Sequence, residues 1–381
     1  MNRSRPRVLV VGHGPPTRGG IPSFVTGLVE DKWLGDRVTI DFFNTCPLRT
    51  KRPGAFNLSN VRLTLAHAAG VLRRSRRLDV VHLNVAPVGV LPLLRAILLS
   101  ACAKPSGAAV ILHAHAGGLA ETASRSALYR VLMKLSMGVV DKVVVVSRDS
   151  ESVLSRLRDG VSFIANGIDL KAFTSKEREV GEPTLVFAGT VCERKGLLDL
   201  RDALLRLRGN GSLSLPFRVS IAGDDAQEPG GFEWIRSAYE AAGLEDVAFL
   251  GALSPQEMVV LFQQASIFCL PSHREGLPLS LLEAMGTGCG VIASDVGDIP
   301  YVLDHGDCGI LFQPHDVGAL SAGIKLLRSD SSLRQNLGRK ARARVEQEFG
   351  RRATNMKLYE LYLESTASRS GLGRNEGLGV A

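Results

Sequence analysis

Short apolar segments rich in valine alternate along the chain with longer segments of mixed character. Apolar residues at consecutive positions are typical of parallel strands that are buried on both faces. Nine such segments lie at Arg7–Val11, Asp79–Leu83, Ala109–His113, Lys142–Ser147, Thr184–Ala188, Arg218–Ala222, Val247–Leu250, Ile267–Leu270 and Gly290–Ala293. The first four and the last five form two successive strand–helix series. The pattern therefore predicts an α/β protein with two doubly wound, Rossmann-like domains that face a cleft.

The segment Thr174–Pro183 separates the two series and predicts a hinge, because it is polar, charged and interrupted by Gly and Pro. From Ala319 onward the chain is expected to be helical. We expect an N-terminal Rossmann-like domain over residues 1–178, a C-terminal one over residues 179–346, a helix over residues 347–364 that packs back toward the N-terminal domain, and a flexible tail rich in Gly and Ser over residues 365–381.

Composition agrees with an ordinary globular protein of two domains: 381 residues, 45% hydrophobic and 22% charged. The six cysteines form no CxxC pair, and no histidine stands at zinc-ligand spacing, so we expect neither disulfides nor structural zinc. A reduced, cytoplasmic protein is expected. The most apolar window, Val85–Ala103, contains Arg95 and two prolines, which favours an amphipathic or buried helix over a membrane-spanning one.

Charge is distributed unequally between the two halves. Residues 1–180 hold 26 basic and 13 acidic residues, a net +13, whereas residues 181–381 hold 20 and 25, a net −5. The densest basic cluster consists of Arg73, Arg74, Arg76 and Arg77. It is either a solvated face or a contact for an anionic membrane surface. Nucleic-acid binding is not expected, because the basic residues are not interleaved with aromatic ones.

The segment that follows the strand ending at Pro271 carries the main candidate chemistry. Pro278 suits the first turn of a helix, so the backbone N–H groups of Gly276 and Leu277 are expected to offer an anion site. Glu275 in the loop and Glu283 in the helix are acceptors of the kind that bind sugar hydroxyls. By themselves, two acids at this separation are more typical of a solvated loop and helix.

The longer sequence around them, PSHREGLPLSLLEAMGTGCGVIASDVGDIP followed by Gly309-Ile-Leu-Phe, resembles the retaining glycosyltransferases of family 4, which have the GT-B architecture. That family carries P-S-x-x-E-G-x-P, E-A-M-x-x-G and V-I-A-S-x-V-G-x-I-P in this order. The resemblance implies that Glu275 contacts the donor hexose and that Glu283 binds the nucleotide ribose. It also implies that Gly276 and Leu277 offer amides to the sugar or diphosphate. More diffusely, it covers residues 7 to 350.

A second segment, Phe187-Ala-Gly189-Thr190-Val-Cys-Glu-Arg194-Lys195-Gly196, also resembles the family. The resemblance implies that Lys195 grips the donor diphosphate beside the backbone of Gly189. The family typically has an arginine directly after this glycine, where this chain has Thr190. Our hypothesis is that Arg194 supplies the missing charge. Gly223 resembles a further family glycine that lets the backbone approach the nucleotide.

In the N-terminal half, the loop after the first strand contains Gly19 and Gly20 but not the dinucleotide fingerprint, because Thr17 stands at its third glycine position. From the residues alone this loop is a turn. The resemblance implies that both glycines approach the donor phosphate or the acceptor. His113 and His115 end another strand without a nearby third metal ligand. The resemblance implies that His115, and secondarily His113, contacts the sugar and supports transfer.

The resemblance implies a retaining hexosyltransferase. We expect it to be metal-independent and without a cofactor, because Asp224-Asp225 is not an Asp-x-Asp metal motif. Its donor would be a nucleotide diphosphate sugar, and its acceptor a lipid-linked or cell-surface polysaccharide intermediate. It would be cytoplasmic, peripheral to the inner face of the plasma membrane. Two alternatives stay open. One is a non-catalytic sugar-nucleotide-binding subunit of a polysaccharide synthase complex, which Thr190 favours. The other is a GT-B sugar-nucleotide epimerase.

Overall fold

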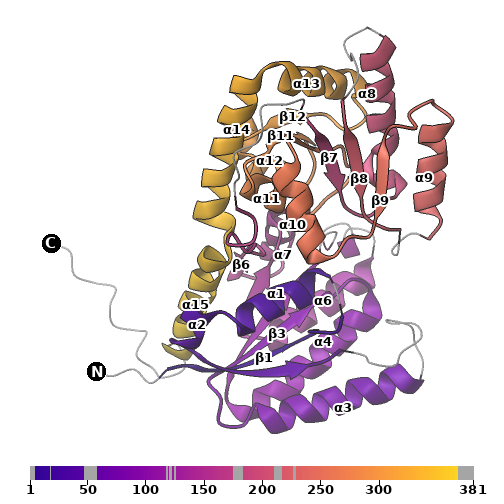
Figure 1. Cartoon of the computed structure of the whole chain (residues 1–381). Helices are drawn as coiled ribbons and strands as arrows, with labels where there is room; N and C mark the ends of the chain where they lie inside the picture. The colour runs from indigo at the N-terminus through magenta and orange to yellow at the C-terminus, as the bar shows by residue number, and fades with distance from the viewer. Residues whose placement is uncertain are drawn as a thin grey trace. The chain divides into compact units, whose positions relative to one another are not determined.

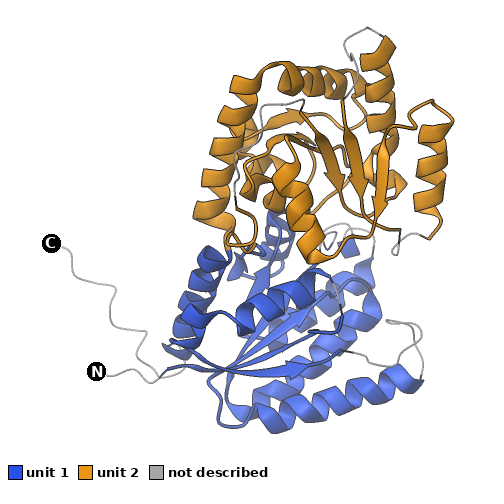
Figure 2. Ribbon diagram, in the orientation of Figure 1, with its two compact units in different colours: residues 1–167, 351–381 blue, residues 168–350 orange. Residues whose placement is uncertain are grey.

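The computed structural model of the chain divides into two compact units, drawn as ribbons in Figure 1 and coloured separately in Figure 2. Unit 1 comprises residues 1–167 and 351–381, and unit 2 comprises residues 168–350. The structure describes residues 5–17, 19–46, 58–116, 119, 122–123, 126–174, 183–209, 217–225 and 229–367.

The boundary between the units is set by a pairing between the two ends of unit 2. The Ile168 amide donates a hydrogen bond to the Phe349 carbonyl over 2.9 Å, and Ile168 pairs with Gly350 in an isolated parallel bridge. Because this pairing joins the start of unit 2 to its end, residues 168–174 lie with unit 2. The sequence pattern had placed them in the N-terminal domain.

The C-terminal helix α15 (Arg351–Ala367) belongs to unit 1. The Thr354 hydroxyl donates a hydrogen bond to the Ala165 carbonyl over 3.1 Å, which fastens the first turns of the helix to that unit. The helix predicted over residues 347–364 thus begins later than expected and continues into the expected tail. The remainder of that tail, and residues 175–182 of the expected hinge, lie outside the described residues.

Unit 1 contains a sheet of six parallel strands in the order β2-β1-β3-β4-β5-β6. The strands are β1 (Arg7–Gly12), β2 (Thr39–Asn44), β3 (Val80–Val85), β4 (Ala109–Ala114), β5 (Lys142–Val145) and β6 (Val161–Phe163). The helices, apart from α15 and the 3-10 turn η1 (Lys104–Ser106), are α1 (Gly20–Val29), α2 (Lys32–Gly35), α3 (Leu58–Arg74), α4 (Val90–Ala103), α6 (Ala127–Val139) and α7 (Arg148–Ser155).

Both faces of this sheet are buried, which explains the uninterrupted apolar segments in the sequence. Successive side chains of a strand point to opposite faces. Leu9 and Val11 of β1 belong to one apolar cluster, together with residues of α3, α4 and α6. Val8 and Val10 belong to another, together with residues of α1 and α15. A strand covered by helices on both sides therefore needs apolar residues at every position.

Unit 2 contains a second sheet of six parallel strands, in the order β12-β11-β10-β7-β8-β9. The strands are β7 (Leu185–Ala188), β8 (Val219–Ala222), β9 (Ala248–Gly251), β10 (Ile267–Leu270), β11 (Gly290–Ser294) and β12 (Ile310–Phe312). The helices are α8 (Leu197–Gly209), α9 (Gly231–Glu240), α10 (Pro255–Gln264), α11 (Leu279–Gly286), α12 (Ile299–Val302), α13 (Val317–Ser329) and α14 (Ser331–Arg344), with the 3-10 turns η2 (Glu193–Lys195) and η3 (Asp304–Gly306) and the π-helical segment η4 (Val345–Phe349).

Each of the nine predicted strands is present, and the predicted class, α/β with two doubly wound Rossmann-like sheets, is confirmed. Three strands were not predicted, namely β2, β6 and β12. All three lie at the edge of a sheet and are only partly buried. β2 and β6 lack the uninterrupted apolar pattern because an edge strand has less of its surface covered, whereas β12 is apolar throughout but only three residues long.

The apolar window around Leu91–Ala103 forms α4, which is partly buried. Leu93 and Leu99 are buried, whereas Leu91 and Leu94 are exposed. Among the described helices, none combines the length and the apolar character that crossing a membrane requires. The six cysteines are free thiols.

Candidate functional site

Loops that follow β7, β8 and β10 meet at the carboxyl edge of the unit 2 sheet. The strand order places β7 beside β10, where the order of connection reverses, and such switch points are where open α/β sheets bind ligands. The Val191 amide donates a hydrogen bond to the Asp224 carbonyl over 2.8 Å, and the His273 amide donates to the Arg194 carbonyl over 2.8 Å. The three loops are therefore held together by backbone hydrogen bonds.

Two glycines allow these loops to approach one another. Gly223 has a φ of 138°, and a Cβ there would lie 1.8 Å from the Gly189 carbonyl oxygen. Gly196 has a φ of 66°, and a Cβ there would lie 1.8 Å from the Pro271 carbonyl oxygen. Both positions combine positive φ with a contact that no side chain would permit, so glycine is required at each. These are two of the glycines that the sequence patterns singled out.

A buried ion pair links two of the loops. The Lys195 ammonium lies 2.5 Å from Glu275 Oε1, and the two side chains are 10% and 8% exposed. The Ser272 hydroxyl donates to the same oxygen over 2.7 Å. The structure thus brings together Lys195 and Glu275, which lie 80 residues apart in the sequence. Both interactions involve Oε1, so among the described residues the other oxygen, Oε2, is available to accept hydrogen bonds from a ligand.

The loop after β10 leads into α11 through Gly276 and Leu277. Among the residues that the structure describes, neither of their amides donates a hydrogen bond to a protein acceptor. The Gly276 carbonyl accepts a hydrogen bond from the Asp298 amide over 3.1 Å, which fixes the peptide. The sequence predicted Pro278 in the first turn of α11. In the structure Pro278 is instead the N-cap of this helix, because its ψ of 119° is extended. Two free N–H groups therefore precede the positive end of a helix.

Glu283 lies within α11, as predicted, and its carboxyl group is half-buried. Burial raises the pKa of Glu283 to about 7, because removal from water disfavours the charged form. No hydrogen bond or ion pair holds this carboxyl group among the described residues. A half-buried acid without a partner is suited to meet polar groups of a ligand.

The position where the family has arginine is occupied by Thr190, which is half-buried and directly follows Gly189. Arg194 and Lys195 share the single 3-10 turn η2, so two basic residues lie in this loop. The arrangement is compatible with the hypothesis that Arg194 supplies the missing charge, and that hypothesis stays a prediction.

In unit 1, Gly19 and Gly20 lie where the loop after β1 enters helix α1. Gly19 is the N-cap and has a φ of 131°, and its carbonyl accepts a hydrogen bond from the Ser23 amide. Both glycines are exposed, and a Cβ at either would meet nothing within 4 Å. Backbone in such an open place is accessible to a ligand, in contrast with the crowded glycines of unit 2.

His115 follows β4 in the same unit and is held at both ring nitrogens. Its Nε2 lies 2.9 Å from Asn84 Oδ1, and its Nδ1 lies 3.1 Å from Asn166 Oδ1. Desolvation lowers the pKa of His115 to about 3, so the ring is neutral. A neutral imidazole donates from one nitrogen only. The Asn84 amide nitrogen faces the Val11 carbonyl at 3.4 Å, so the Asn84 oxygen accepts from Nε2–H.

Two residues that the sequence did not single out extend this arrangement. His82 of β3 lies 3.1 Å from His113 through Nε2, and 2.7 Å from the Tyr362 hydroxyl through Nδ1. Burial lowers the pKa of His82 to about 3 and keeps His113 neutral as well. Tyr362 comes from α15, so the C-terminal helix completes a chain of neutral polar groups inside unit 1. Its position 280 residues from His82 left no local signal in the sequence.

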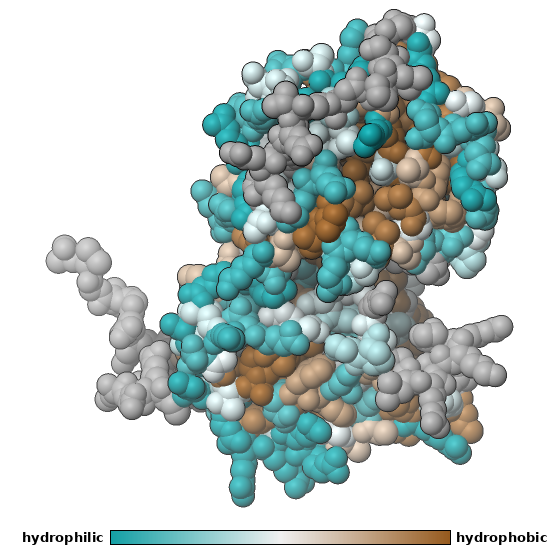
Figure 3. Space-filling model, in the orientation of Figure 1, coloured by the Kyte–Doolittle hydropathy of each residue, from teal (hydrophilic) through white to brown (hydrophobic). Residues whose placement is uncertain are grey.

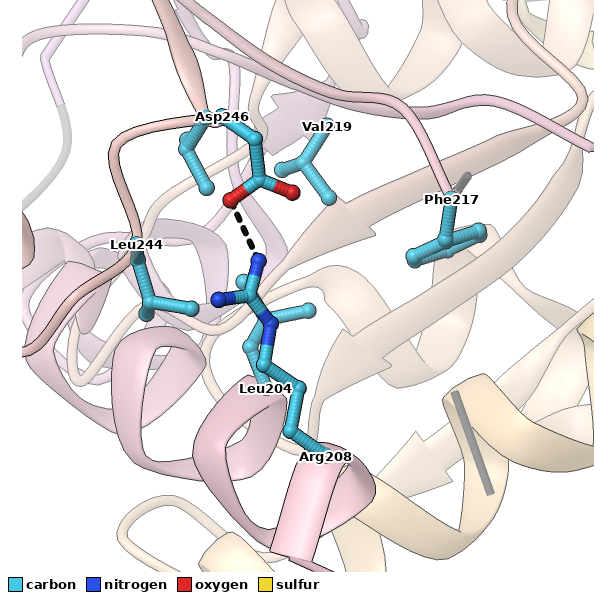
Figure 4. Close-up of a pocket in the computed structure, with 7 residues that line it drawn as sticks. Leu204, Arg208, Phe217, Val219, Leu244 and Asp246 are labelled. Atoms are coloured by element: carbon cyan, nitrogen blue, oxygen red, sulfur yellow. Dashed lines mark hydrogen bonds and ion pairs between the residues drawn. The ribbon is translucent and has the colours of Figure 1, made fainter. Parts of the chain in front are cut away.

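A small hollow in unit 2 lies away from these loops (Figure 4). It is lined mainly by apolar residues, among them Leu204, Phe217, Val219 and Leu244, and an ion pair between Arg208 and Asp246 crosses it. Val219 is the first residue of β8, so the hollow is at the amino edge of the sheet, the opposite end from the candidate site.

Helices α3, α4 and α6 of unit 1 pack side by side, α3 on α4 and α4 on α6, and expose apolar side chains. Figure 3 shows apolar residues interspersed with polar ones on the visible face of the protein. The exposed members are Leu58, Val61, Leu65 and Leu72 of α3, Leu91 and Leu94 of α4, and Leu128, Val131 and Leu135 of α6. Arg73, Arg74, Arg76 and Arg77 are exposed at the end of α3.

Solved structures share this fold over nearly the whole chain. Sucrose-phosphate synthase (tll1590) from Thermosynechococcus elongatus is similar with a TM-score of 0.77 and 22% identity, covering 96% of this chain and 100% of that one. The Anabaena protein HepE, solved in complex with UDP, is similar with a TM-score of 0.72 and 15% identity, covering 94% and 100%. The class defined by the two sheets is therefore the GT-B fold of glycosyltransferases.

The family described as glycosyl transferases group 1 matches residues 170–344 of this chain. Glycogen synthase of Mycobacterium tuberculosis is 29% identical over 206 residues, which cover 53% of this chain and 48% of that protein. D-inositol 3-phosphate glycosyltransferase of Saccharomonospora viridis is 30% identical over 231 residues, covering 56% and 52%. The putative colanic acid biosynthesis glycosyltransferase WcaL of Salmonella typhimurium is 29% identical over 205 residues, covering 51% and 49%. The chain spans about half the length of the curated relatives it matches.

Proposed function

We propose that this chain is a retaining glycosyltransferase of family 4 that moves a hexose from a nucleotide diphosphate sugar to an acceptor hydroxyl. The observation that carries the proposal is the buried pair of Lys195 and Glu275 at the sheet switch point of unit 2. Beside it lie the glycine backbone at Gly189 and the free amides before α11. A cation, an acceptor and unpaired amides at one sheet edge match the chemistry of a sugar diphosphate.

In this proposal the donor separates the ion pair. The diphosphate competes with Glu275 for the Lys195 ammonium, while Glu275 accepts hydrogen bonds from hexose hydroxyls through Oε2, which has no partner among the described residues. Ser272 keeps Glu275 in place through Oε1. Because the pair is already formed, both groups are held in position before the donor arrives, and little ordering remains to be done on binding.

Glu283 is assigned to the nucleotide ribose. Its carboxyl group is half-buried and has no partner among the described residues, so two ribose hydroxyls would find an acceptor there.

Catalysis would rest on stabilising the negative charge that builds on the departing diphosphate. Lys195 and Arg194 supply positive charge, and the amides of Gly276 and Leu277 supply hydrogen bonds, so we propose transfer without a metal. The acceptor oxygen forms a bond to the anomeric carbon on the face that the diphosphate leaves. The bond from that carbon to the diphosphate oxygen breaks, and the acceptor proton passes to the departing phosphate. Gly19, Gly20 and His115 are the groups that unit 1 presents to the substrates.

The acceptor is proposed to be a lipid-linked or cell-surface polysaccharide intermediate, reached at the inner face of the plasma membrane. Support comes from the exposed apolar residues of α3, α4 and α6 beside the cluster Arg73–Arg77, a combination that suits an anionic bilayer. Changing Arg73, Arg76 and Arg77 to Gln should weaken binding to phosphatidylglycerol vesicles, whereas Arg156→Gln, at the C-cap of α7, should not. Equal binding by both variants would remove the membrane from the proposal.

The experiment that tests the donor site is calorimetric titration with UDP-, GDP- and ADP-sugars. One nucleotide class should bind, and Glu283→Ala should weaken that binding by about tenfold, which is the loss of one hydrogen-bonded contact. Absence of binding to all three classes would contradict the proposal.

The departure at Thr190 favours one other candidate, a sugar-nucleotide-binding subunit without transfer activity. Binding of a donor that is never consumed in the presence of a range of lipid-linked acceptors would favour it. In that case Thr190→Arg, which restores the charge of the family pattern, should raise donor affinity if the site is otherwise intact.

A further inference from the structure

A cluster of two histidines and one aspartate lies beside the candidate donor loops in unit 2. Asp199 is in the first turn of α8, His273 is in the loop after β10, and His315 follows β12. His273 Nε2 lies 2.9 Å from Asp199 Oδ2, and His315 Nδ1 lies 3.7 Å from the same oxygen. One ligand atom from each residue lies within 4.8 Å of the other two.

These distances are close to those of a metal site. Imidazole nitrogen and carboxylate oxygen bind Zn²⁺ at about 2.0–2.2 Å, so ligand atoms of a tetrahedral site lie about 3.3 Å apart. The Asp199 and His273 side chains are 16% and 21% exposed and contact each other, whereas the His315 side chain is 67% exposed. A rotation of the His315 ring is therefore the main adjustment that a metal would need.

We propose that Asp199, His273 and His315 bind a divalent transition metal ion of the Zn²⁺ type, with water in the fourth position. Two imidazoles and one carboxylate are a ligand set that suits Zn²⁺, Co²⁺ and Ni²⁺, and not Mg²⁺ or Ca²⁺, which prefer oxygen ligands. The site does not depend on the proposed transferase activity, because it is built from different side chains.

The bound ion would connect three segments of unit 2. His273 stands two residues before Glu275, and its amide already donates a hydrogen bond to the Arg194 carbonyl. A metal on its ring would anchor the loop that carries Glu275 to α8 and to the segment after β12. It would therefore stabilise unit 2 and hold that loop in the conformation seen in this structure.

Sequence spacing gave no sign of this site. His273 is 74 residues from Asp199, and His315 lies on yet another loop, so no ligand motif exists. Parallel strands bring the three loops to one sheet edge, and only the fold places their side chains together.

The test is a titration of the full chain with Co²⁺, followed by visible absorption, and with Zn²⁺, followed by calorimetry. One ion per chain should bind, with the strong d–d bands of four-coordinate Co²⁺, and Zn²⁺ should displace it. His315→Ala should weaken binding by at least about tenfold, and Asp199→Asn should weaken it as well. The melting temperature should rise with Zn²⁺ in the native chain but much less in His315→Ala.

His305→Ala is the matched control, because His305 is also an exposed histidine of unit 2 with positive φ, at 54°, but lies outside the cluster. It should bind the metal like the native chain. Equal affinity in His315→Ala and His305→Ala would overturn the proposal, as would failure of the native chain to bind Co²⁺ or Zn²⁺. Circular dichroism of each variant shows that it is folded, and the exposure of His315 makes its replacement well tolerated.

Discussion

The candidate site residues of the two units differ in their charge and in how closely the backbone around them is packed. In unit 2, charge and close backbone contact dominate: Lys195 and Glu275 form a buried ion pair, and Gly223 touches another loop. In unit 1, the buried groups are neutral, with His115 held between two asparagine side chains, and Gly20 has open space around it. Unit 2 is thus suited to holding an anion in one fixed place. Unit 1 is suited to meeting an uncharged group through adaptable surroundings.

This difference indicates which substitutions should change the stability of the fold and which should change ligand binding alone. A crowded glycine or a buried charge is part of the fold as well as of the site, so its removal affects both. An open glycine is part of the site only. The two units should therefore respond differently to the same type of change.

The largest effect is expected for Gly223→Ala. A Cβ at residue 223 would lie 1.8 Å from the Gly189 carbonyl oxygen at a φ of 138°, so the β7 and β8 loops would have to separate. We expect a loss of unfolding free energy on the order of 5 kcal/mol, or failure of unit 2 to fold. Gly20→Ala in unit 1 should change stability by less than about 1 kcal/mol. Denaturant unfolding measures both, and similar losses would erase the contrast between the units.

Next in size is the ion pair. Glu275→Gln leaves the Lys195 ammonium buried without its counter-charge, which should reduce the unfolding free energy by about 3–5 kcal/mol. Replacing both residues, by Lys195→Met and Glu275→Gln, should recover part of this stability, because no unpaired charge then remains. Donor binding should stay lost in the double variant. If the double variant is no more stable than Glu275→Gln, the pair is not energetically coupled, and our description of unit 2 is wrong.

Much of the fold could be predicted from the sequence, because strands buried on both faces leave a distinct apolar pattern. The edge strand β2 could not, because its sequence TIDFFN is only partly buried. For the site, family motifs located Glu275 and Lys195, but not the contact between them, which depends on packing of two loops. Tyr362 and the cluster of Asp199 with His273 and His315 were missed, because their partners are distant in the sequence and meet only in the folded chain.

The pH dependence of stability and of nucleotide binding provides a third test. It concerns Glu283, because burial raises the pKa of this carboxyl group to about 7. The ordinary pKa of 4.5 applies to the unfolded chain, so the folded chain holds the proton more tightly. Stability should therefore fall as the pH rises from about 4.5 to 7, by on the order of 3 kcal/mol, and then level off. Nucleotide affinity should rise over pH 6 to 8, because the carboxylate is the better acceptor. In Glu283→Gln both dependences should disappear, and a persistent slope would assign them to another group.

The smallest effect is expected for the hydrogen-bonded series of neutral polar groups in unit 1, which contains His113, His82 and Tyr362. Tyr362→Phe removes the hydroxyl that lies 2.7 Å from His82 Nδ1 and leaves that buried nitrogen without a partner. We expect a loss of about 1–3 kcal/mol, the cost of an unsatisfied buried polar group. Tyr359→Phe on the same helix is the control, because the Tyr359 hydroxyl has no hydrogen bond among the described residues, and it should stay within about 0.5 kcal/mol. Since His82 also touches His113, Tyr362→Phe should lower the protection of β3 and β4 amides in hydrogen exchange and leave those of unit 2 unchanged. Equal stability of the two variants would mean that the C-terminal helix contributes apolar packing only.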